Sequence, residues 1–582
     1  MKINKKPLKS KVGTEQVRNT LGRDLGYVIR LFGRYIKADP MWCLLLFGGQ
    51  IGAGAVGAIL GLQLQRRLAE ITNALGNGDG SQIAVHTSAI IWLTAAITTI
   101  GVVAIFAMYT LQIRFRRVVN GKLVSQWITD DRFYHMERQQ KLDYPEQRIQ
   151  EDISLTVNTF LRLAPEVTIG SLTVFLYIGQ LWNMSPPISI PVLGITKPIP
   201  GFLVFCTLGF AVGMTLITHW IGIRLTNAEI ARQTLEARYR QQMAAVRHNG
   251  ETIAFTRGGE VERSRVEKTF ELIRLNWASY VNATIAVRTI TGLPMSMLMI
   301  APTLIFAPFV LSGAMGIGDV NLIGVSIMSV YVGAGILMSN YVALALLRSS
   351  VARLRRLEEV LGEQQVIGIN LGSEDRADIQ LENLSVAFPN GQAMNTVGDL
   401  AIRQGDRLLI KGRSGAGKST LLRAIAGLWP EGSGQVRVPA DANIVFLPQR
   451  PYLPAGTIAD LLAYPNRSDV ARYPVYEDIL RRLGLERLVP FMDEHAVWSN
   501  SLSLGEQQRI AAARAILSEP DYLFVDEATS ALDARLEADV YALMEERLPN
   551  SAIISVAHRP AVERYHSKTL EIDAGRSTAT AY

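Results

Sequence analysis

The stretch Gly412-Arg413-Ser414-Gly415-Ala416-Gly417-Lys418-Ser419-Thr420 decides the fold of one half of this chain, because it fits the pattern G-x-x-x-x-G-K-[ST]. Loops of this pattern surround nucleotide phosphates with backbone N–H groups, and their glycines keep a Cβ out of the way. The lysine is expected to neutralise the β- and γ-phosphates, and the serine hydroxyl to hold Mg²⁺. The predicted ATP contacts in this stretch are Gly412, Ser414, Gly415, Gly417, Lys418, Ser419 and Thr420.

The residues on either side of the loop agree with this interpretation. Residues 407–411 are predicted to form a short buried strand, and residues 420–426 a helix. The N-terminus of a helix favours an anion through its dipole and its free N–H groups. A chance glycine-rich turn would lack this strand–loop–helix context. The sequence therefore predicts a nucleotide-binding domain around the loop.

The composition indicates a membrane protein. The chain has 582 residues, enough for more than one domain, and its formal net charge is +7 although 48% of its residues are hydrophobic. Lysine and arginine are spread out, which argues against nucleic-acid binding and fits cationic cytosolic surfaces. Cys43 and Cys206 both lie in apolar stretches, so a disulfide framework is not expected. The lysine-rich start is not followed at once by an apolar run, unlike a cleaved signal peptide.

Six apolar runs in the first half are each long enough to cross a bilayer, which takes about 20 residues. The runs are 41–64, 88–111, 166–182, 200–223, 285–311 and 320–347. Lysine and arginine concentrate before the first run and in the stretches 112–165 and 224–284, whereas the other connections are short and carry few. By the positive-inside rule, both termini are expected in the cytosol. The two long stretches are predicted to be helical extensions below the membrane.

Two ionisable residues fall within the apolar runs, Arg288 in the fifth and His219 in the fourth. Such residues are either functional or placed so that they reach the membrane interface, and the sequence leaves both options open. A set of polar residues in the runs also has two options: these residues either line a pathway or form hydrogen bonds between helices, and the sequence does not decide between them. This set is Gln50, Gln63, Gln65, Gln180 and Asn340.

The character of the chain changes after residue 350, where a charged helical end is followed by a linker-like segment. We therefore divide the chain into a transmembrane domain with six spans at 1–363, a linker at 364–378, and a nucleotide-binding domain at 379–582. The expected fold is an α-helical membrane domain fused to an α/β P-loop ATPase domain.

Further residues of the second half suit ATP hydrolysis. The predicted strand 522–527 ends in Asp526 and Glu527, which suit Mg²⁺ coordination and polarisation of the attacking water as a general base, respectively. Gln449 ends the predicted strand 444–449 and is placed to reach the Mg²⁺ and that water. His558 ends another predicted strand, 553–558, where an imidazole can sense the γ-phosphate, although a lone histidine is more often structural.

Three more positions are predicted to contact the nucleotide. Ser503 and Gly505 begin a helix and present a hydroxyl and bare N–H groups to a γ-phosphate. Phe388 precedes a turn, where its ring either stacks on adenine or packs at an edge.

Together these motifs resemble those of an ATP-binding-cassette (ABC) ATPase over about 200 residues. In order, they are similar to the adenine-stacking aromatic, Walker A, the Q-loop, the LSxGE signature, Walker B with its catalytic glutamate, the D-loop and the H-switch. The matching positions are Phe388, Gly412–Ser419, Gln449, Leu502–Glu506, Asp526 with Glu527, Ser530–Asp533 and His558. With the six spans, the chain resembles an ABC half-transporter of the exporter fold. The resemblance also implies that Asp533, in the D-loop, belongs to the ATP site.

A narrower resemblance is carried by the first half. Residues 142–149, with Asp152, are similar to the P-x-Q-R-I segment of the peroxisomal fatty-acyl ABC transporters and their bacterial relatives. Residues 236–240 and 251–255 are similar to that group's second motif, and 426–430 also match. Residues 493–501 replace the T-E-V-G-E-x-G stretch of common multidrug exporters. The bacterial branch includes the SbmA/BacA-like and YddA-like proteins, and its SbmA/BacA-like members take up peptides and similar hydrophilic molecules.

The resemblance implies a homodimer in the bacterial inner membrane, with two composite ATP sites and both termini cytoplasmic. Our first hypothesis is ATP-driven transport of peptides or other hydrophilic compounds, inward, by alternating access. The second is movement of fatty-acyl compounds or lipids. The third is a membrane-anchored ATPase regulator that gates a partner and carries nothing. Substrate identity and direction are left open by the sequence, as are the substrate-contacting residues and any contribution of an ion gradient.

Overall fold

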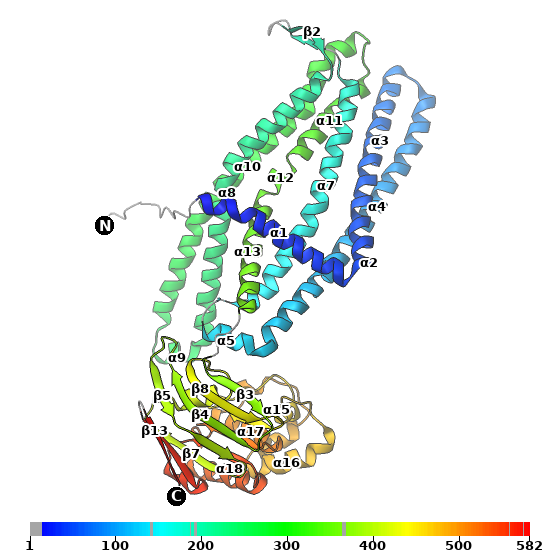
Figure 1. Ribbon diagram of the computed structural model, residues 1–582. Coiled ribbons are helices and arrows are strands. Elements are labelled where there is room, and N and C mark those ends of the chain that lie inside the picture. Colours follow the sequence, from blue (N-terminus) through cyan, green and yellow to red (C-terminus); the bar gives the residue numbers. More distant parts are fainter. Residues whose placement is uncertain are drawn as a thin grey trace, which may run out of the picture. The chain divides into compact units, whose positions relative to one another are not determined.

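A computed structural model describes residues 14–139, 142, 144–186, 188–190, 195–363, 368–557, 559–573 and 576–581. The chain divides into two compact units, Met1–Gly362 and Glu363–Tyr582. The first is helical, and the second contains two β-sheets with helices around them (Figure 1).

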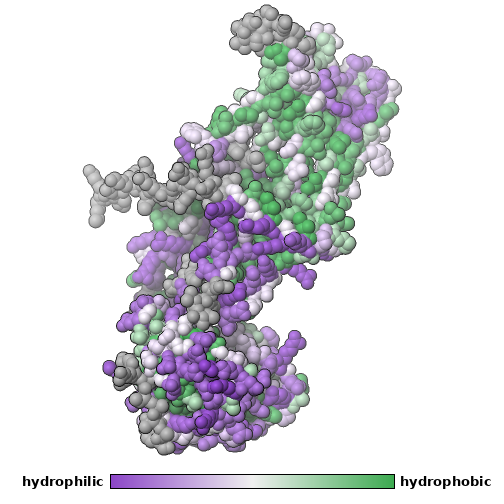
Figure 2. All heavy atoms as spheres, viewed as in Figure 1, coloured by the Kyte–Doolittle hydropathy of each residue, from purple (hydrophilic) through white to green (hydrophobic). Residues whose placement is uncertain are grey.

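Six segments of the first unit are long and apolar enough to cross a membrane, as the sequence predicts. Their main helices are α3 (Gly49–Asn77), α4 (Gly80–Ile128), α7 (Ile153–Met184), α8 (Phe202–His248), α10 (Gly259–Leu311) and α11 (Ile317–Ala334). Figure 2 shows a hydrophobic surface over these helices. The side chains of Trp92, Phe106 and Leu304 are each at least 70% exposed. Apolar side chains so exposed are suited to lipid or to a partner subunit.

The sixth span differs from its prediction. The sequence suggests one apolar segment over 320–347, but α11 ends at Ala334 and is followed by the short helix α12 (Ile336–Ser339) and by α13 (Tyr341–Gly362). Gly335 and Asn340 lie at the two interruptions. Glycine is a poor helix former, which favours a break at this point. The sixth span is therefore a broken helix whose last part continues beyond the apolar stretch.

Most of the predicted helical extensions are present. α8 runs on to His248 and α10 begins at Gly259, with only the short helix α9 (Gly250–Phe255) between them. The stretch 112–165 is less regular. α4 ends at Ile128, and four short elements precede α7 in the described residues: a 3₁₀ turn (Thr129–Asp131), α5 (Arg132–Arg138), α6 (Pro145–Gln147) and a π-helical turn, Arg148–Asp152. Figure 1 shows α5 and α9 at the same end of the unit.

An additional helix, α1 (Thr14–Ala38), crosses the long helices (Figure 1). Its buried Tyr35 packs against Phe115 of α4, with ring centroids 5.1 Å apart. The first span then begins with α2 (Pro40–Cys43) and a π-helical segment, Leu44–Gly48. A small hairpin, β1 (Ile188–Ile190) and β2 (Ile195–Ile199), joins α7 to α8.

Some polar residues of the spans bond between helices. The Gln180 side chain of α7 accepts a hydrogen bond of 2.9 Å from Arg66 of α3. Asn340 donates to the Glu166 carboxylate of α7 over 3.0 Å. His219 lies edge-on to Tyr341, with ring centroids 5.4 Å apart. Gln180 and Asn340 therefore form hydrogen bonds between helices, which is one of the two options that the sequence left open.

The second unit is built around a six-stranded sheet in the order β13-β12-β7-β11-β10-β9. All neighbours are parallel except β13, which is antiparallel to β12. The strands are β7 (Arg407–Gly412), β9 (Ile444–Leu447), β10 (Tyr522–Asp526), β11 (Ala552–Val556), β12 (Lys568–Asp573) and β13 (Arg576–Ala581). β7, β9, β10 and β11 confirm predicted strands. Side chains such as Phe446 and Phe524, stacked at 4.7 Å, fill its core.

A second sheet contains β3 (Asn370–Glu374), β4 (Asp378–Ala387), β5 (Ala393–Val397), β6 (Leu400–Arg403) and β8 (Gly432–Pro439). β3 corrects the predicted linker 364–378, of which residues 364–367 lie outside the described residues. Its backbone pairs with β8 in parallel, and Arg437 of β8 forms an ion pair of 3.1 Å with Glu374. Such tertiary pairing overrides the weak strand propensity of glycine and asparagine in this segment.

Five α-helices accompany the two sheets in the described part of this unit: α14 (Lys418–Ile425), α15 (Ile458–Ala463), α16 (Tyr473–Arg482), α17 (Leu504–Leu517) and α18 (Ala534–Arg547). α15, α16, α17 and α18 contribute buried side chains to one apolar core, whereas α14 packs with the strands of both sheets.

A close approach of α11 to α3 provides a test of the helical unit. A Cβ at Gly318 would lie 1.9 Å from the Ala69 carbonyl oxygen, and the Gly318 N–H donates to Asn73 over 2.7 Å. We expect Gly318→Ala to separate the two helices and to lower the free energy of unfolding by about 1–3 kcal/mol. The melting temperature in detergent measures this effect.

The matched control is Gly101→Ala in α4, where a Cβ meets open space. Alanine is the better helix former, so this variant should melt at or above the wild-type temperature. Equal melting temperatures for Gly318→Ala and Gly101→Ala would contradict the packing of α3 against α11.

Candidate active site

The loop 412–417 joins β7 to α14 and has the backbone of an anion-binding turn. Gly412, Gly415 and Gly417 have φ angles of +150°, +82° and +87°, in the region where L-residues are strained. A Cβ at Gly417 would also lie 2.5 Å from the Met394 sulfur. The predicted need for glycine at these positions thus has a structural cause. Ser414 lies exposed in the loop, and Thr420 is buried in the first turn of α14.

Lys418 begins α14, and its side chain folds back over the loop. Its Nζ donates to the carbonyl oxygens of Gly412 and Arg413 over 2.9 and 3.1 Å. Burial lowers the pKa of this ammonium, while Glu527 and Asp526 oppose the shift. An anion arriving in the loop would replace neutral carbonyl partners with an opposite charge, which favours its binding.

Asn395 of β5 supports the loop from the other sheet. It is fully buried, and its Nδ2 donates to the carbonyl oxygens of Ala416 and Gly417 over 3.0 and 3.3 Å. The sequence analysis missed this residue. No motif in the sequence marks a single buried amide of this kind.

Asp526 and Ser419 meet across the sheet edge. The strands β7 and β10 are both parallel to β11, which lies between them, so their carboxyl ends lie at one edge. There the Ser419 hydroxyl donates to the Asp526 carboxylate over 2.8 Å. Burial raises the pKa of Asp526, with a smaller contribution from Glu527, and the Ser419 hydroxyl opposes the shift.

Glu527 and Gln449 form a second pair beside the first. The Gln449 Nε2 donates to the Glu527 carboxylate over 2.9 Å. Glu527 has φ of +49°, an uncommon conformation for a residue other than glycine. Backbone strain of this kind is often stored at functional sites. Four of the predicted residues, Ser419, Gln449, Asp526 and Glu527, are thus brought together in pairs at one edge.

The signature segment lies at the start of α17. Ser503 is its N-cap and accepts from the Glu506 N–H over 3.3 Å, while Glu506 binds Arg487. A Cβ at Gly505 would lie 3.2 Å from the Ala531 carbonyl oxygen, so the D-loop packs closely against the helix start. Asp533 caps α18 by accepting from the N–H groups of Arg535 and Leu536.

Gln508 connects three of these motifs, although the sequence analysis did not single it out. It is 1% exposed, donates to the Gln449 carbonyl oxygen over 2.9 Å and accepts from the Ala531 N–H over 3.0 Å. The Q-loop, the signature helix and the D-loop therefore share one buried amide. Losing it would leave buried polar groups unpaired, at a cost of about 1–3 kcal/mol.

Two more predicted residues follow strands of this unit. Phe388 follows β4 in the turn to β5 and is 41% exposed, which leaves its ring free to stack. His558 lies outside the described residues. The next residue, Arg559, donates to the carbonyl oxygens of Leu532 and Ser530 and so ties the end of β11 to the D-loop.

The donor set fits a hard divalent cation. Ser419, Asp526 and Gln449 offer hydroxyl, carboxylate and amide oxygens, which Mg²⁺ prefers. Among the described residues, no group of three or more His, Cys, Asp or Glu side chains could hold a metal ion. Mg²⁺ here would therefore rely on nucleotide phosphates and water for its other ligands, as is usual for this ion.

The segments that carry the narrower resemblance meet in the first unit. A cavity of about 760 Å³ is lined by Tyr144, Gln147 and Arg148 from one segment and by Glu236, Ala237 and Arg240 from the other. Beside it, Arg353 of α13 binds the buried Asp152 carboxylate over 2.5 Å. Two motifs about 90 residues apart in the sequence thus form one structural feature.

The fold and the site together define a membrane-embedded helical unit joined to a P-loop ATPase, and comparisons with known proteins agree. Residues 43–310 match the family ABC transporter transmembrane region 2, and residues 396–530 match the ABC transporter family. The chain is similar in fold to a bacterial Atm1-family ABC exporter with ATP bound, with a TM-score of 0.74 at 18% identity, covering 92% of this chain and 95% of that one.

Relatives in other organisms resemble the chain over most of its length. An ABC transporter ATP-binding protein of Haemophilus influenzae is 31% identical over 78% of this chain and 76% of its own. The inner membrane ABC transporter ATP-binding protein YddA of Escherichia coli is 27% identical, covering 80% and 82%. ABC transporter D family member 2, chloroplastic, of Arabidopsis thaliana is 25% identical, covering 86% and 79%.

The chain therefore belongs to the ABC transporter family. It is a half-transporter of the exporter fold, related to YddA and to the D family, and its ATPase domain couples ATP to transport. The predicted fold and ATPase activity are confirmed. It is a multi-pass membrane protein, and a half-transporter implies a dimer.

The raised pKa of Asp526 predicts a pH effect on Mg²⁺ binding. A buried carboxyl with a raised pKa holds its proton at a higher pH than an ordinary aspartate, and a metal ligand must be ionised. We expect the affinity for Mg²⁺ in the presence of ATP to fall as the pH is lowered into the range where this carboxyl takes up its proton, and binding to release a proton there beyond the proton that free ATP releases to Mg²⁺. Calorimetry in buffers of different ionisation enthalpy measures both.

Asp526→Asn should remove this proton release and weaken Mg²⁺ binding at every pH. The exposed Asp441→Asn serves as control and should behave as wild type. Proton release that persists unchanged in Asp526→Asn would contradict the assignment.

Proposed function

We propose that this protein forms a homodimer in the bacterial inner membrane that uses ATP to carry peptides or other hydrophilic compounds inward. ATP-driven transport follows from the family, whereas the substrate class, the direction and the homodimer are the proposal. The observation that carries the substrate class is a cavity among the spans, of about 540 Å³, that is lined by hydroxyl groups as well as apolar side chains.

In this proposal the loop 412–420 holds the ATP phosphates, with Lys418 on the β- and γ-phosphates and Phe388 stacked on adenine. Ser419 and Asp526, with Gln449, would hold Mg²⁺, which supplies charge neutralisation at the phosphates. Glu527 polarises the attacking water as a general base, oriented by the hydrogen bond from Gln449. His558 senses the γ-phosphate from the end of β11.

The proposed homodimer gives a role to the predicted site residues that lie outside the phosphate loop and the sheet edge. The chain has one phosphate loop and one signature, and we propose that Ser503 and Gly505, with Asp533, complete the site of the partner subunit. Closing two such sites with ATP would favour one state of the spans, and hydrolysis would release it. The shared amide of Gln508 supports this role, because it links the signature helix to the Q-loop of the same chain.

The alternative is transport of fatty-acyl compounds, which the resemblance of the first half to fatty-acyl transporters suggests. The cavity among the spans has hydroxyls from Thr215, Thr218, Thr284, Thr291 and Ser339, which give a hydrophilic substrate hydrogen-bonding groups within a mainly apolar lining. Sites for small molecules of either class have mainly apolar linings, so the preference rests on these hydroxyls. We therefore place hydrophilic substrates first.

Glu527→Gln tests whether hydrolysis drives transport. We expect the variant to bind ATP but to hydrolyse it about 10²–10⁴-fold more slowly, because the general base is lost while the fold is kept. Uptake of a labelled peptide into cells should fall to background. Glu545→Gln, at an exposed position of α18, is the control and should take up peptide normally.

Continued uptake in Glu527→Gln at the wild-type rate would refute the ATP-driven mechanism. Uptake of labelled acyl compounds in place of peptide would establish the alternative. ATP hydrolysis that no substrate stimulates in liposomes, with nothing transported, would instead indicate a membrane-anchored regulator.

A further inference from the structure

We propose that Arg288 selects substrates by their carboxylate group, inside the cavity formed by α8, α10 and the broken sixth span. This inference rests on the proposed function, because it treats that cavity as the substrate site. It adds what the family does not supply, namely the residue that recognises the substrate and the chemical group it recognises.

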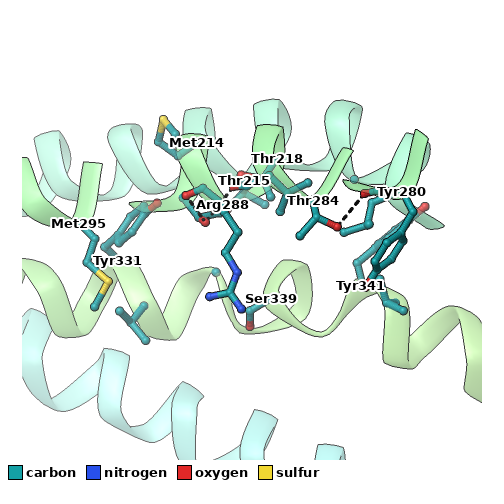
Figure 3. Close-up of a pocket in the computed structure, with 17 residues that line it drawn as sticks. Met214, Thr215, Thr218, Tyr280, Thr284, Arg288, Met295, Tyr331, Ser339 and Tyr341 are labelled. Atoms are coloured by element: carbon teal, nitrogen blue, oxygen red, sulfur yellow. Dashed lines mark hydrogen bonds between the residues drawn. The ribbon is translucent and has the colours of Figure 1, made fainter. Parts of the chain in front are cut away.

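The cavity lies where the spans meet the helical extensions. Its lining comes from α8 between Met214 and Leu225, from α10 between Tyr280 and Met295, and from residues 331–342 around the breaks in the sixth span. Figure 3 shows the Arg288 side chain extending from α10 toward Ser339 of α12. The break in the sixth span therefore faces the guanidinium group.

Arg288 is the one charged residue among the 17 that line the cavity. Within the part of the chain that the structure describes, its guanidinium has no ion pair or hydrogen bond. The hydroxyls of Thr284 and Thr291 donate to carbonyl oxygens of their own helix over 2.8 and 2.9 Å. Glu166 of α7 is bound to Asn340 and is not among the lining residues.

A charge placed among membrane spans is costly unless it has a partner or faces water, and such residues commonly mark substrate pathways. The sequence left open whether Arg288 reaches the interface or acts in the cavity. The structure places it in the cavity wall, with Met214, Met295 and Val332 beside it for apolar parts of a substrate. An anionic substrate group would supply the missing counter-charge.

The lining favours a carboxylate among anions. A guanidinium binds a carboxylate through two parallel N–H donors. A phosphate group carries more charge than one arginine neutralises, and no lysine, histidine or second arginine is among the lining residues. Peptides and fatty acids both end in a carboxylate, so either source satisfies the site.

The test uses the full-length dimer in lipid nanodiscs without ATP and two matched ligand pairs. One pair is a short peptide with a free or an amidated C-terminus, and the other is a medium-chain fatty acid and its amide. We expect wild-type protein to bind the free acid about tenfold more tightly than the amide in at least one pair. Arg288→Gln should bind both members equally, and Arg288→Lys should keep part of the preference because it keeps the charge.

Arg274→Gln, on the same helix but exposed and paired with Glu271, is the control and should keep the wild-type preference. Basal ATP hydrolysis should be unchanged in Arg274→Gln, and the melting temperature of each of the three variants verifies its folding. If Arg288→Gln does not fold, the partial loss in Arg288→Lys decides.

A carboxylate preference that survives in Arg288→Gln, or that is absent from both pairs in wild type, overturns the inference. A preference in the fatty-acid pair alone upholds the role of Arg288 and refutes the peptide class of the proposed function. A preference in the peptide pair supports both.

Discussion

The ATP site depends on the hydrogen bond between Ser419 and Asp526, 2.8 Å long, at the edge of the six-stranded sheet. The two residues are 107 positions apart in the sequence, and they meet because β7 and β10 run parallel on either side of β11. This edge also brings Gln449, at the end of β9, to Glu527. The sheet therefore brings to one place the groups that we propose for phosphate, metal and water, and such preorganisation is the condition for efficient electrostatic catalysis.

Two buried amide side chains connect the residues at the sheet edge to the neighbouring elements. Asn395 holds the phosphate loop from the second sheet, and Gln508 holds the Q-loop against the signature helix and the D-loop. Gln508 thus connects the Gln449–Glu527 pair to the start of α17, where we propose that the partner's nucleotide binds. In the membrane unit, the helix break at Gly335 lines the same cavity as Arg288.

Much of this could be predicted from the sequence. The glycine pattern of 412–417 specifies backbone angles that other residues avoid, and the apolar runs specify spans by length alone. The predicted strands were found where the site needs them: β10 ends at Asp526, β7 leads into the phosphate loop, and β9 is followed by Gln449. β3 was missed because its strand depends on pairing with β8 rather than on its own composition. Asn395 and Gln508 were missed because a buried amide in a helix or strand has no signal of its own in a single sequence. Only the structure could show that Arg288 faces the cavity, because the sequence of a span does not distinguish its cavity side from its lipid side.

The central claim is that one chain supplies half of each of two ATP sites, and mixing two inactive chains tests it most directly. Lys418→Ala breaks the phosphate loop and Gly505→Asp breaks the signature, so each homodimer has two defective sites. In a mixed dimer both defects fall in one site and leave the other intact. The account predicts that each variant alone hydrolyses no ATP and that an equal mixture regains about a quarter of the wild-type rate. Mixed dimers that are isolated through two different tags and show no hydrolysis would contradict it.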